Sequence, residues 1–385
     1  MHVPLCDLAR QAQLLRDELI GTIERVLLSG RYILGEEVKA FEKAISQYLG
    51  VRHAIGVASG TDALWLALKA VGVGPGDCVL TSPFTFFATI SAILHAGARP
   101  VFVDIDPQTY NIDPLEVRAV LEGYSSVCKR LKIVPETIRA IIPVHLYGLP
   151  ADMETLLEIS NVYGLRVIED AAQSLGAEYC GKKVGTFGDL GCFSFFPTKH
   201  LGALGDGGLI VTNDDEWAEQ VRMLRAHGAR VKHHHEIIGT NSRLDALQAA
   251  ILQIKLKYVP RWISIRQRLA QRYTERLCDL PNVRVPQQTP TAVHTFHLYT
   301  ICLTDNSRDR LRAFLKEHGI DTGVYYPTPA HLQPALKFLG YQAGDFPRAE
   351  QAARSVLSLP LFPEMTLEEQ NHVVRVIYSF YGVSS

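Results

Sequence analysis

One lysine near the middle of this 385-residue chain, Lys199, stands between an aromatic segment at residues 193–197 and a glycine-rich segment at residues 202–208. Burial among apolar groups penalises the ammonium form of a lysine, so such surroundings favour a neutral amine that can attack a carbonyl carbon. The pattern indicates a lysine that forms a Schiff base. An ordinary solvated loop lysine fits the same segment when it is taken alone.

An acidic side chain, Asp170, follows an apolar run at residues 165–168. A carboxylate at the tip of a buried strand can keep a pyridine nitrogen protonated, and pyridoxal phosphate needs that proton to act as an electron sink. Gln173, three residues further on, is expected to reach the ring hydroxyl of the same cofactor. Taken alone, Asp170 fits equally well as the cap of the next turn. Together with Lys199 it predicts a pyridoxal-phosphate enzyme that acts on carbon–nitrogen bonds.

A short polar segment, Ser-Gly-Thr at residues 59–61, lies between a predicted strand and a predicted helix. Backbone amides at a helix N-terminus bind phosphate, and hydroxyl groups add further hydrogen bonds. Ser194 offers another hydroxyl close to the lysine. Most such segments are ordinary helix caps. An aromatic ring from residues 83–89 is expected to stack on the pyridine, although phenylalanines in such a run are more often core residues.

Short apolar runs alternate with segments at helical spacing over the first half of the chain. Strands are predicted at residues 54–58, 78–81, 100–103, 140–145, 166–169, 190–196 and 208–212, and helices at 5–28, 38–49, 61–71, 85–96 and 151–163. Such alternation predicts an α/β fold with a large, mostly parallel central sheet and helices on both faces. The ligand site of such a sheet lies beyond the carboxyl ends of its strands.

The C-terminal part of the chain has a different pattern. An apolar stripe over residues 244–258 predicts a helix, and further helices are expected at 261–279, 308–318, 349–357 and 367–381, with a strand at 294–303. This mixture predicts a smaller C-terminal α/β domain. We therefore expect a large domain over residues 1–250, which includes the N-terminal helical segment, and a small domain over residues 251–385.

The composition argues against several other classes of protein. The net charge is -1 and no run of five like charges occurs, so a nucleic-acid or membrane-surface partner has no electrostatic support. The chain has neither an apolar stretch of about 18 residues nor a signal-peptide pattern, so we expect a cytoplasmic location. Its seven cysteines are spaced unlike a disulfide framework or a zinc ribbon, and the Gly-x-Gly-x-x-Gly motif is absent.

Several motifs, in this order along the chain, resemble those of the DegT/StrS family of nucleotide-sugar aminotransferases. They are Ser-Gly-Thr at 59–61, Pro-Phe-Thr-Phe at 83–86, Glu-Asp-Ala-Ala-Gln-Ser at 169–174, Ser-Phe-Phe-Pro-Thr-Lys at 194–199, Gly-Asp-Gly-Gly at 205–208 and Asn-Ser-Arg-Leu-Asp at 241–245. The resemblance spans nearly the whole chain. It implies a fold type I aminotransferase that depends on pyridoxal 5'-phosphate.

The resemblance implies a role for each matching residue. Lys199 looks like the Schiff-base lysine and proton shuttle, Asp170 like the partner of the pyridine nitrogen, and Gln173 like the neighbour of the ring oxygen. The other implied cofactor contacts are Phe86, which stacks on the ring, and a phosphate-binding group made of Gly60, Thr61, Ser194 and, from a second subunit, Asn241. A site shared in this way implies an obligate homodimer with a large apolar interface.

The resemblance further implies a ping-pong reaction in which L-glutamate gives its amino group and a keto-sugar on a nucleoside diphosphate receives it. The motif at 241–245 is similar to that of enzymes acting on 3-keto sugars, more than to the 4-keto group of the family. A dTDP-linked 3-keto-6-deoxyhexose is our first expectation for the acceptor, and a UDP-linked 3-keto-N-acetylhexosamine is the second. Amination of a 4-keto sugar is the alternative.

Further residues are expected to contact the substrates. They are Arg31 and Tyr32 for the donor carboxylate, Lys232 and His235 for the diphosphate at the subunit interface, and Tyr325, Tyr326 and His331 at the border of the sugar pocket. The three histidines at 233–235 invite a metal site, but consecutive residues of a regular backbone do not all converge on one ion. We expect a polar loop there and no metal.

Three other functions are compatible with part of this pattern. A sugar dehydratase of the family resembles sequences with histidine in place of the Schiff-base lysine, whereas here Lys199 is present and His200 is displaced by one position. A regulatory homologue keeps the fold without needing an intact site. An aldolase with a Schiff-base lysine uses no cofactor and has no visible chromophore.

Overall fold

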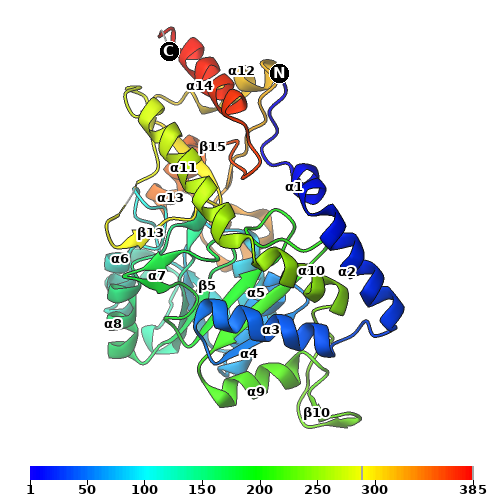
Figure 1. The fold of residues 1–385 in the computed structure, drawn as a ribbon. Helices are drawn as coiled ribbons and strands as arrows, with labels where there is room; N and C mark the ends of the chain where they lie inside the picture. Colours follow the sequence, from blue (N-terminus) through cyan, green and yellow to red (C-terminus); the bar gives the residue numbers. More distant parts are fainter. Residues whose placement is uncertain (288, 384–385) are drawn as a thin grey trace.

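The computed structural model describes residues 1–287 and 289–383, and a seven-stranded sheet lies at its centre (Figure 1). In spatial order the strands are β1 (His53–Val57), β9 (Gly208–Thr212), β8 (Leu190–Ser194), β5 (Arg166–Asp170), β4 (Ile138–Ile142), β2 (Cys78–Thr81) and β3 (Arg99–Phe102). All pairs from β8 to β3 are parallel, whereas β9 is antiparallel to both β8 and β1. The prediction of a mostly parallel sheet is confirmed, with β9 as its reversed strand.

Helices cover both faces of this sheet. One face packs against α4 (Gly60–Ala70), α5 (Phe87–His95) and α9 (Asp215–Leu224). The other face packs against α3 (Glu36–Leu49), α10 (Ala246–Leu256), α6 (Pro114–Leu121) and α8 (Met153–Tyr163). Successive residues of a strand point to opposite faces, so Leu209 and Val211 of β9 pack on the α3 side while Ile210 packs on the α4 side.

The C-terminal part of the chain builds a second core. Its antiparallel sheet has the order β12 (Val283–Arg284), β14 (Tyr299–Leu303) and β15 (Val356–Leu359), and it packs with α11 (Val259–Leu277), α12 (Arg308–Glu317) and α14 (Leu367–Tyr381). Val3, near the N-terminus, joins this core and forms a bridge with Ile320. Both ends of the chain accordingly lie beside the C-terminal unit in Figure 1.

Helix α11 connects the two cores. Its first turns place Val259 and Ile263 in the core of the large sheet, and its later turns place Leu269 and Tyr273 in the C-terminal core. The predicted division after residue 250 falls inside α10, and Ile251, just beyond it, is buried in the core with α3. The two cores therefore share a continuous helix.

Two C-terminal segments differ from their predicted structure. The predicted strand over 294–303 begins only at Tyr299, because Phe296 has a φ of 49°, a left-handed conformation that a regular strand does not accommodate. The predicted helix over 349–357 ends at Ser355, and Val356 starts β15 instead. Pairing of Val356 with Cys302 of β14 overrides the helical spacing there.

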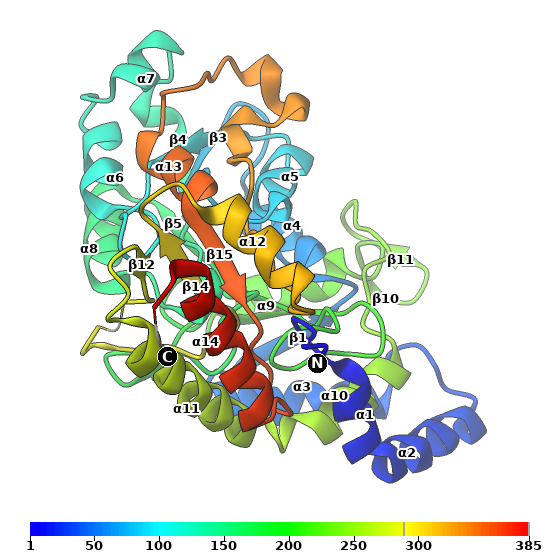
Figure 2. The same cartoon turned by 90° about the horizontal axis from the view of Figure 1, so that it is seen from above.

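The remaining elements are short or peripheral. The helices are α1 (Leu8–Leu14), α2 (Arg16–Ser29), α7 (Ser126–Arg130) and α13 (Pro347–Ser355), with 3-10 turns at Pro135–Thr137, Leu146–Gly148, Ala330–Leu332 and Pro334–Leu339. The strands are β6 (Glu178–Tyr179), β7 (Lys182–Lys183) and β13 (Ala292–Val293) in one small sheet, and β10 (Ala229–Val231) with β11 (His234–His235) in a hairpin. Figures 1 and 2 show α2 and this hairpin at the same edge of the molecule. Among the described residues, every helix is too short or too polar to cross a membrane.

Candidate active site

A cavity of about 520 Å³ lies between the carboxyl ends of the central strands and the C-terminal unit. Apart from Asn241, which was predicted to come from a second subunit, every residue that the sequence analysis assigned to the cofactor lines this cavity. They are Gly60, Thr61, Phe86, Asp170, Gln173, Ser194 and Lys199. These residues come from the start of α4, the turn before α5, the ends of β5 and β8, and the loops that follow those two strands. Because β5 and β8 are parallel neighbours, their carboxyl ends meet at one edge of the sheet.

Asp170 is the last residue of β5 and is buried. Thr89 Oγ1 donates to Asp170 Oδ2 at 2.8 Å, and the Ala172 N–H donates to Oδ1 at 3.2 Å. Burial raises the pKa of the carboxyl group, and these hydrogen bonds together with the charge of Lys199 oppose that rise. A cation placed against a buried carboxylate stabilises its charged form. A protonated pyridine nitrogen is such a cation.

The neighbouring Glu169 points to the other side of β5 and fixes the strand end. Its carboxylate accepts N–H bonds from Gly185, Phe187 and Gly188 at 2.6 to 2.7 Å. It also lies 3.0 Å from His145 Nε2. Since the Ala151 N–H donates to His145 Nδ1 at 3.0 Å, the ring hydrogen of His145 is on Nε2 and donates to Glu169. This network holds the main chain of Asp170 in place.

Lys199 lies in a tight loop that follows β8. The Ala203 N–H donates to the carbonyl of Phe195, and Lys255 Nζ donates to the carbonyl of Gly202, both at 2.8 Å. Burial lowers the pKa of Lys199 from 10.5 to about 8, and the charge of Asp170 partly opposes this shift. Near neutral pH the amine therefore releases its proton far more readily than an exposed lysine does.

The N-terminus of α4 opens into the cavity beside Ser194. Ser59 caps the helix by accepting from the Asp62 N–H at 3.1 Å. A Cβ atom at Gly60 would lie 2.7 Å from Ser194 Cβ, so glycine is required for the serine to approach the helix this closely. The positive end of the α4 dipole, with the hydroxyls of Thr61 and Ser194, makes a donor set that suits a phosphate group. With Asp170 and Lys199 in the same cavity, the residues present fit pyridoxal phosphate.

Gln173 is held by two hydrogen bonds that determine how its amide is oriented. The Tyr147 N–H donates to Gln173 Oε1 at 2.7 Å, and Gln173 Nε2 donates to the Tyr326 hydroxyl at 3.0 Å. The ring of Tyr326 lies 6.1 Å from the ring of Phe86, centroid to centroid. Phe86 itself is 58% exposed in the single chain. Both rings line the cavity.

The C-terminal wall of the cavity contains two polar residues that the sequence analysis did not identify, Arg266 of α11 and His297. A signal for Arg266 was present in the sequence. The buried side of α11 runs through Ile263, Arg266 and Ala270, so the arginine occupies an apolar position of an amphipathic helix. The segment containing His297 offered no such signal, because it was predicted to be a strand.

Three predicted site residues, Arg31, Tyr32 and Asn241, lie outside the cavity of their own chain and are exposed. Two contacts join the turn that contains Arg31 and Tyr32 to the segment after Asn241. The Ala246 N–H donates to the carbonyl of Tyr32 at 2.9 Å, and Ile33 forms a bridge with Asp245. The turn after α2 therefore lies against the segment that follows Asn241.

The remaining residues that were predicted to contact the substrates lie in three places: on an exposed hairpin, in the cavity wall and in the protein interior. Lys232 and His235 are exposed on the β10–β11 hairpin, and Tyr325 lines the cavity. His331 differs from its expected position at the sugar pocket, because its ring is buried 4.8 Å from the ring of Phe346. Its Nε2 lies 3.1 Å from Glu350 Oε1, so this nitrogen has a partner within the fold.

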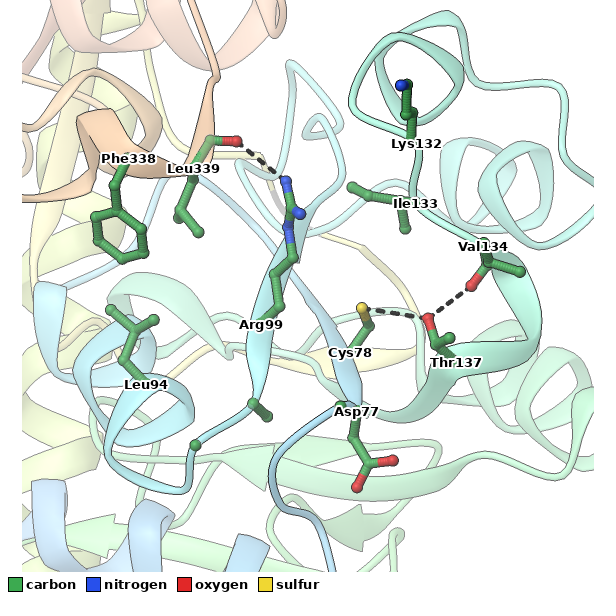
Figure 3. A pocket seen from close by; sticks show the side chains of 13 residues that line it. Asp77, Cys78, Leu94, Arg99, Lys132, Ile133, Val134, Thr137, Phe338 and Leu339 are labelled. Atoms are coloured by element: carbon green, nitrogen blue, oxygen red, sulfur yellow. Dashed lines mark hydrogen bonds between the residues drawn. The ribbon is translucent and has the colours of Figure 1, made fainter.

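A second cavity of about 510 Å³ lies at the opposite ends of β2 and β3 (Figure 3). Cys78 and Arg99, which begin these strands, form part of its wall together with Phe338. Arg99 Nη2 donates to the carbonyl of Leu339 at 3.1 Å, as drawn in Figure 3. This cavity contains none of the motif residues and lies away from the carboxyl ends of the strands, where such sheets bind ligands. We therefore place the active site in the first cavity.

Residues 13–378 match the model of the DegT/DnrJ/EryC1/StrS aminotransferase family. The chain is 50% identical over 385 residues to the pleiotropic regulatory protein of Geobacillus stearothermophilus, with 99% of both chains covered. It is 44% identical over 376 residues to UDP-N-acetyl-3-dehydro-alpha-D-glucosamine 3-aminotransferase of Acidithiobacillus ferrooxidans, with 97% of both covered. It is also 44% identical over 376 residues to dTDP-3-amino-3,4,6-trideoxy-alpha-D-glucose transaminase of Streptomyces venezuelae, with 98% of this chain and 94% of that protein covered.

Among solved structures, that of S. venezuelae DesV in complex with a ketimine intermediate superposes with a TM-score of 0.93 at 42% identity, with 100% of both chains covered. The fold and the site define a fold type I aminotransferase. The chain belongs to the DegT/DnrJ/EryC1/StrS aminotransferase family, which confirms the resemblance drawn from its motifs.

Proposed function

We propose that this chain is a pyridoxal-phosphate-dependent enzyme that transfers the amino group of L-glutamate to the 3-keto group of a nucleoside-diphosphate sugar, giving an amino sugar and 2-oxoglutarate. The supporting observation is the convergence of three features on one cavity. These are an amine with a pKa of about 8 at Lys199, the buried carboxyl group of Asp170, and the N-terminus of α4.

Each group has a defined task in this reaction. When bound, pyridoxal phosphate supplies a ring that accepts the electron pair left on the donor's α-carbon after a proton is removed. Asp170 keeps the ring nitrogen protonated. Lys199 would take the proton from the donor's α-carbon and deliver it to C4′ of the cofactor, the carbon on the other side of the transferred nitrogen, a task suited to an amine with a pKa of about 8. The N-terminus of α4, with Ser194, anchors the phosphate so that the reacting end stays at Lys199 in both half-reactions.

The acceptor is a 3-keto sugar in this proposal. The segment at 241–245 supports it, and two relatives bear names that describe 3-amino or 3-dehydro nucleotide sugars. A dTDP-linked 3-keto-6-deoxyhexose is the first candidate and a UDP-linked 3-keto-N-acetylhexosamine the second. A 4-keto sugar is the alternative acceptor, and turnover of matched 3-keto and 4-keto compounds distinguishes them.

The active unit is a homodimer in this proposal. Exposed apolar side chains gather on α1, α2 and the following turn, where they include Leu14, Leu27, Leu28 and Ile33. The β10–β11 hairpin lies at the same edge as α2 (Figures 1 and 2), and Asn241 forms a bridge with Ala226, just before this hairpin. A second copy seated on this edge removes the apolar side chains from water and brings Arg31, Asn241, Lys232 and His235 toward the partner's cavity.

A regulatory role is the second candidate, because one relative at 50% identity is called a pleiotropic regulatory protein. The enzyme is favoured here because Lys199, Asp170, Gln173 and Ser194 are all present and line one cavity. A protein that only kept the fold would not need this set. A cytoplasmic location belongs to the same proposal, since the cysteines among the described residues are all free, as is usual in a reducing compartment.

The absorption spectrum of the purified protein tests this proposal. We expect a visible cofactor band that Lys199→Ala abolishes and that L-glutamate converts to the band of the aminated cofactor. Restoration of the first band by a 3-keto nucleotide sugar completes the cycle. A protein that stays colourless after pyridoxal phosphate is added contradicts the enzymatic proposal and favours a regulatory role.

A further inference from the structure

His297 is a buried polar residue in the wall of the cavity that also contains Lys199. It is 8% exposed, and its Nδ1 has no hydrogen-bond partner within the part of the chain that the structure describes. Its ring lies beside that of His200, with centroids 5.4 Å apart. A buried polar group without a partner costs free energy. Because Nδ1 is buried, a ligand in the cavity can reach His297 only through its other ring nitrogen, Nε2.

The other ring nitrogen of His297, Nε2, is the atom that a ligand in the cavity can reach. Burial, together with the nearby charge of Lys199, lowers the pKa of His297 well below its ordinary value, so the ring is neutral and bears one hydrogen. Among buried backbone groups, an N–H without an acceptor is rarer than an acceptor without a donor. The buried Nδ1, which has no partner, is by the same reasoning the nitrogen without a hydrogen. The hydrogen is therefore on Nε2, and the wall presents an N–H donor to the cavity.

Arg266 lies against the main chain of His297 and is 5% exposed. Its Nη1 donates to the carbonyls of Leu361 at 2.7 Å, Phe296 at 3.3 Å and His297 at 3.4 Å. All three acceptors are neutral. Glu364 is near enough to raise the pKa of Arg266, but burial of the guanidinium lowers that pKa more strongly. The positive charge of Arg266 is thus poorly balanced inside the chain.

We propose that His297 and Arg266 form the subsite that binds a carboxylate of the amino donor, an inference that rests on the proposed function. His297 Nε2 donates to a carboxylate oxygen. Arg266 supplies positive charge at the same wall and fixes the main chain at residues 296–297.

The donor carboxylate fits this wall better than the other anion of the reaction does. The α-carbon of the amino donor must come within reach of Lys199, and its carboxylate is one bond away. The diphosphate is attached to C1 of the sugar and is therefore more distant from a reacting C3. Arg31 and Tyr32, the residues that the sequence assigned to this carboxylate, are exposed and would reach a cavity only in the proposed dimer, whereas His297 and Arg266 line the cavity of their own chain.

The test uses the holoenzyme with His297→Gln and Arg266→Lys. His372→Gln is the control, because this ring pairs with the carbonyl of His318 away from the cavity. The first probe is glutarate, an unreactive dicarboxylate with the carbon chain of glutamate, and its affinity is measured by calorimetry. The second probe is the first half-reaction, in which the loss of the visible cofactor band is followed with L-glutamate and with butylamine, which has no carboxylate.

We expect His297→Gln to weaken the binding of both glutarate and L-glutamate by about tenfold to a hundredfold, the value of a hydrogen bond to a charged group. The rate with butylamine is expected to stay within about twofold of the wild type, because only the carboxylate contact is lost. Arg266→Lys keeps the charge without the planar fork of donors and is expected to have a smaller effect in the same direction.

Equal glutarate affinity in the wild type and His297→Gln would overturn the subsite. An equal loss with L-glutamate and butylamine would also overturn it, since that result indicates a general disturbance of the cavity. The glutarate measurement does not depend on the cofactor band. A wild-type protein that binds glutarate through His297 but has no cofactor band would contradict the proposed function while supporting the subsite.

Discussion

Asp170 and Lys199 reach one cavity from two adjacent parallel strands. Asp170 ends β5 and is paired with Cys192 of β8, and the chain leaves β8 into the loop that contains Lys199. Each of the two groups acts on the pKa of the other. The acid and the amine have separate tasks in the proposed reaction, so they can be tested separately.

Asp170→Asn tests the role of the buried acid. Asparagine keeps the size of the side chain and can still accept from Thr89, but it does not hold a proton on a pyridine nitrogen. We expect the rate of amino transfer to fall by at least about a hundredfold, or about 2.7 kcal/mol, with the cofactor still bound. Thr89→Val removes only one hydrogen bond to Asp170 and is expected to cost about tenfold. Wild-type rates in Asp170→Asn would exclude the proposed role.

The pKa of Lys199 predicts how its reactivity depends on pH. Burial favours the neutral amine, so reductive labelling of Lys199 in cofactor-free protein is expected to rise through a midpoint of about 8 instead of 10.5. Mass spectrometry of the labelled peptides at a series of pH values measures this. Asp170→Asn removes the opposing negative charge and is expected to move the midpoint lower. A midpoint near that of an exposed lysine would show that Lys199 is solvated.

The same pKa shift has a consequence for stability. Between about pH 8 and pH 10.5 the unfolded chain retains a proton on this lysine that the folded chain has released. The unfolded state binds more protons, so the contribution of Lys199 to the free energy of unfolding increases as the pH rises through this interval. Denaturant unfolding of cofactor-free wild type and Lys199→Met across the interval measures the contribution, which the methionine variant should lack.

Gly60→Ala tests the contact between α4 and Ser194. The added Cβ would lie 2.7 Å from Ser194 Cβ, so either the serine or the start of the helix must move. We expect the affinity for pyridoxal phosphate to fall by about tenfold or more, because the amides of the first turn lose their alignment with the phosphate. Gly74→Ala is the matched control, since its nearest neighbour is 4.0 Å away. Equal cofactor affinity in both variants would mean that α4 does not hold the phosphate.

Leu28→Glu tests the proposed dimer edge. Leu28 is 79% exposed on α2, and a charge there is costly only if another molecule covers it. We expect sedimentation to show dissociation into monomers, with activity falling in parallel because Asn241 then no longer reaches a second cavity. Leu115→Glu, at a leucine 75% exposed on α6, should remain dimeric and active. A Leu28→Glu protein that remains dimeric would place the interface elsewhere.

That the predicted cofactor residues of one chain line a single cavity could be anticipated, because they lie in short segments near strand ends. Strand β5 is a largely buried segment that ends at Asp170, and the parallel packing of strands brings such ends to one edge. The C-terminal wall was not predictable in this way. His297 reaches the cavity because Phe296 is left-handed and Thr295 N–H donates to the carbonyl of Gly148 at 3.0 Å. These contacts join distant parts of the chain, and local periodicity does not reveal them.

In the fold, too, elements that depend on neighbouring residues could be predicted, whereas elements that depend on contacts between distant residues could not. The seven strands of the large sheet were anticipated from apolar runs, with ends that differ by a few residues. The first two residues of β15, Val356 and Leu357, were expected to end a helix, and their pairing with β14 makes them part of a strand instead. His331 was expected at the sugar pocket, but its ring is buried and lies against Glu350. The two residues are 19 positions apart, so local spacing did not reveal this contact.

The most direct test of the central proposal is borohydride reduction of the holoenzyme followed by peptide mass spectrometry. Reduction makes the bond between the lysine and pyridoxal phosphate permanent. We expect the mass of the reduced cofactor on Lys199 and on no other lysine. Reduced cofactor on a different lysine, or none on Lys199 in a protein that contains the cofactor, would contradict the proposed reaction.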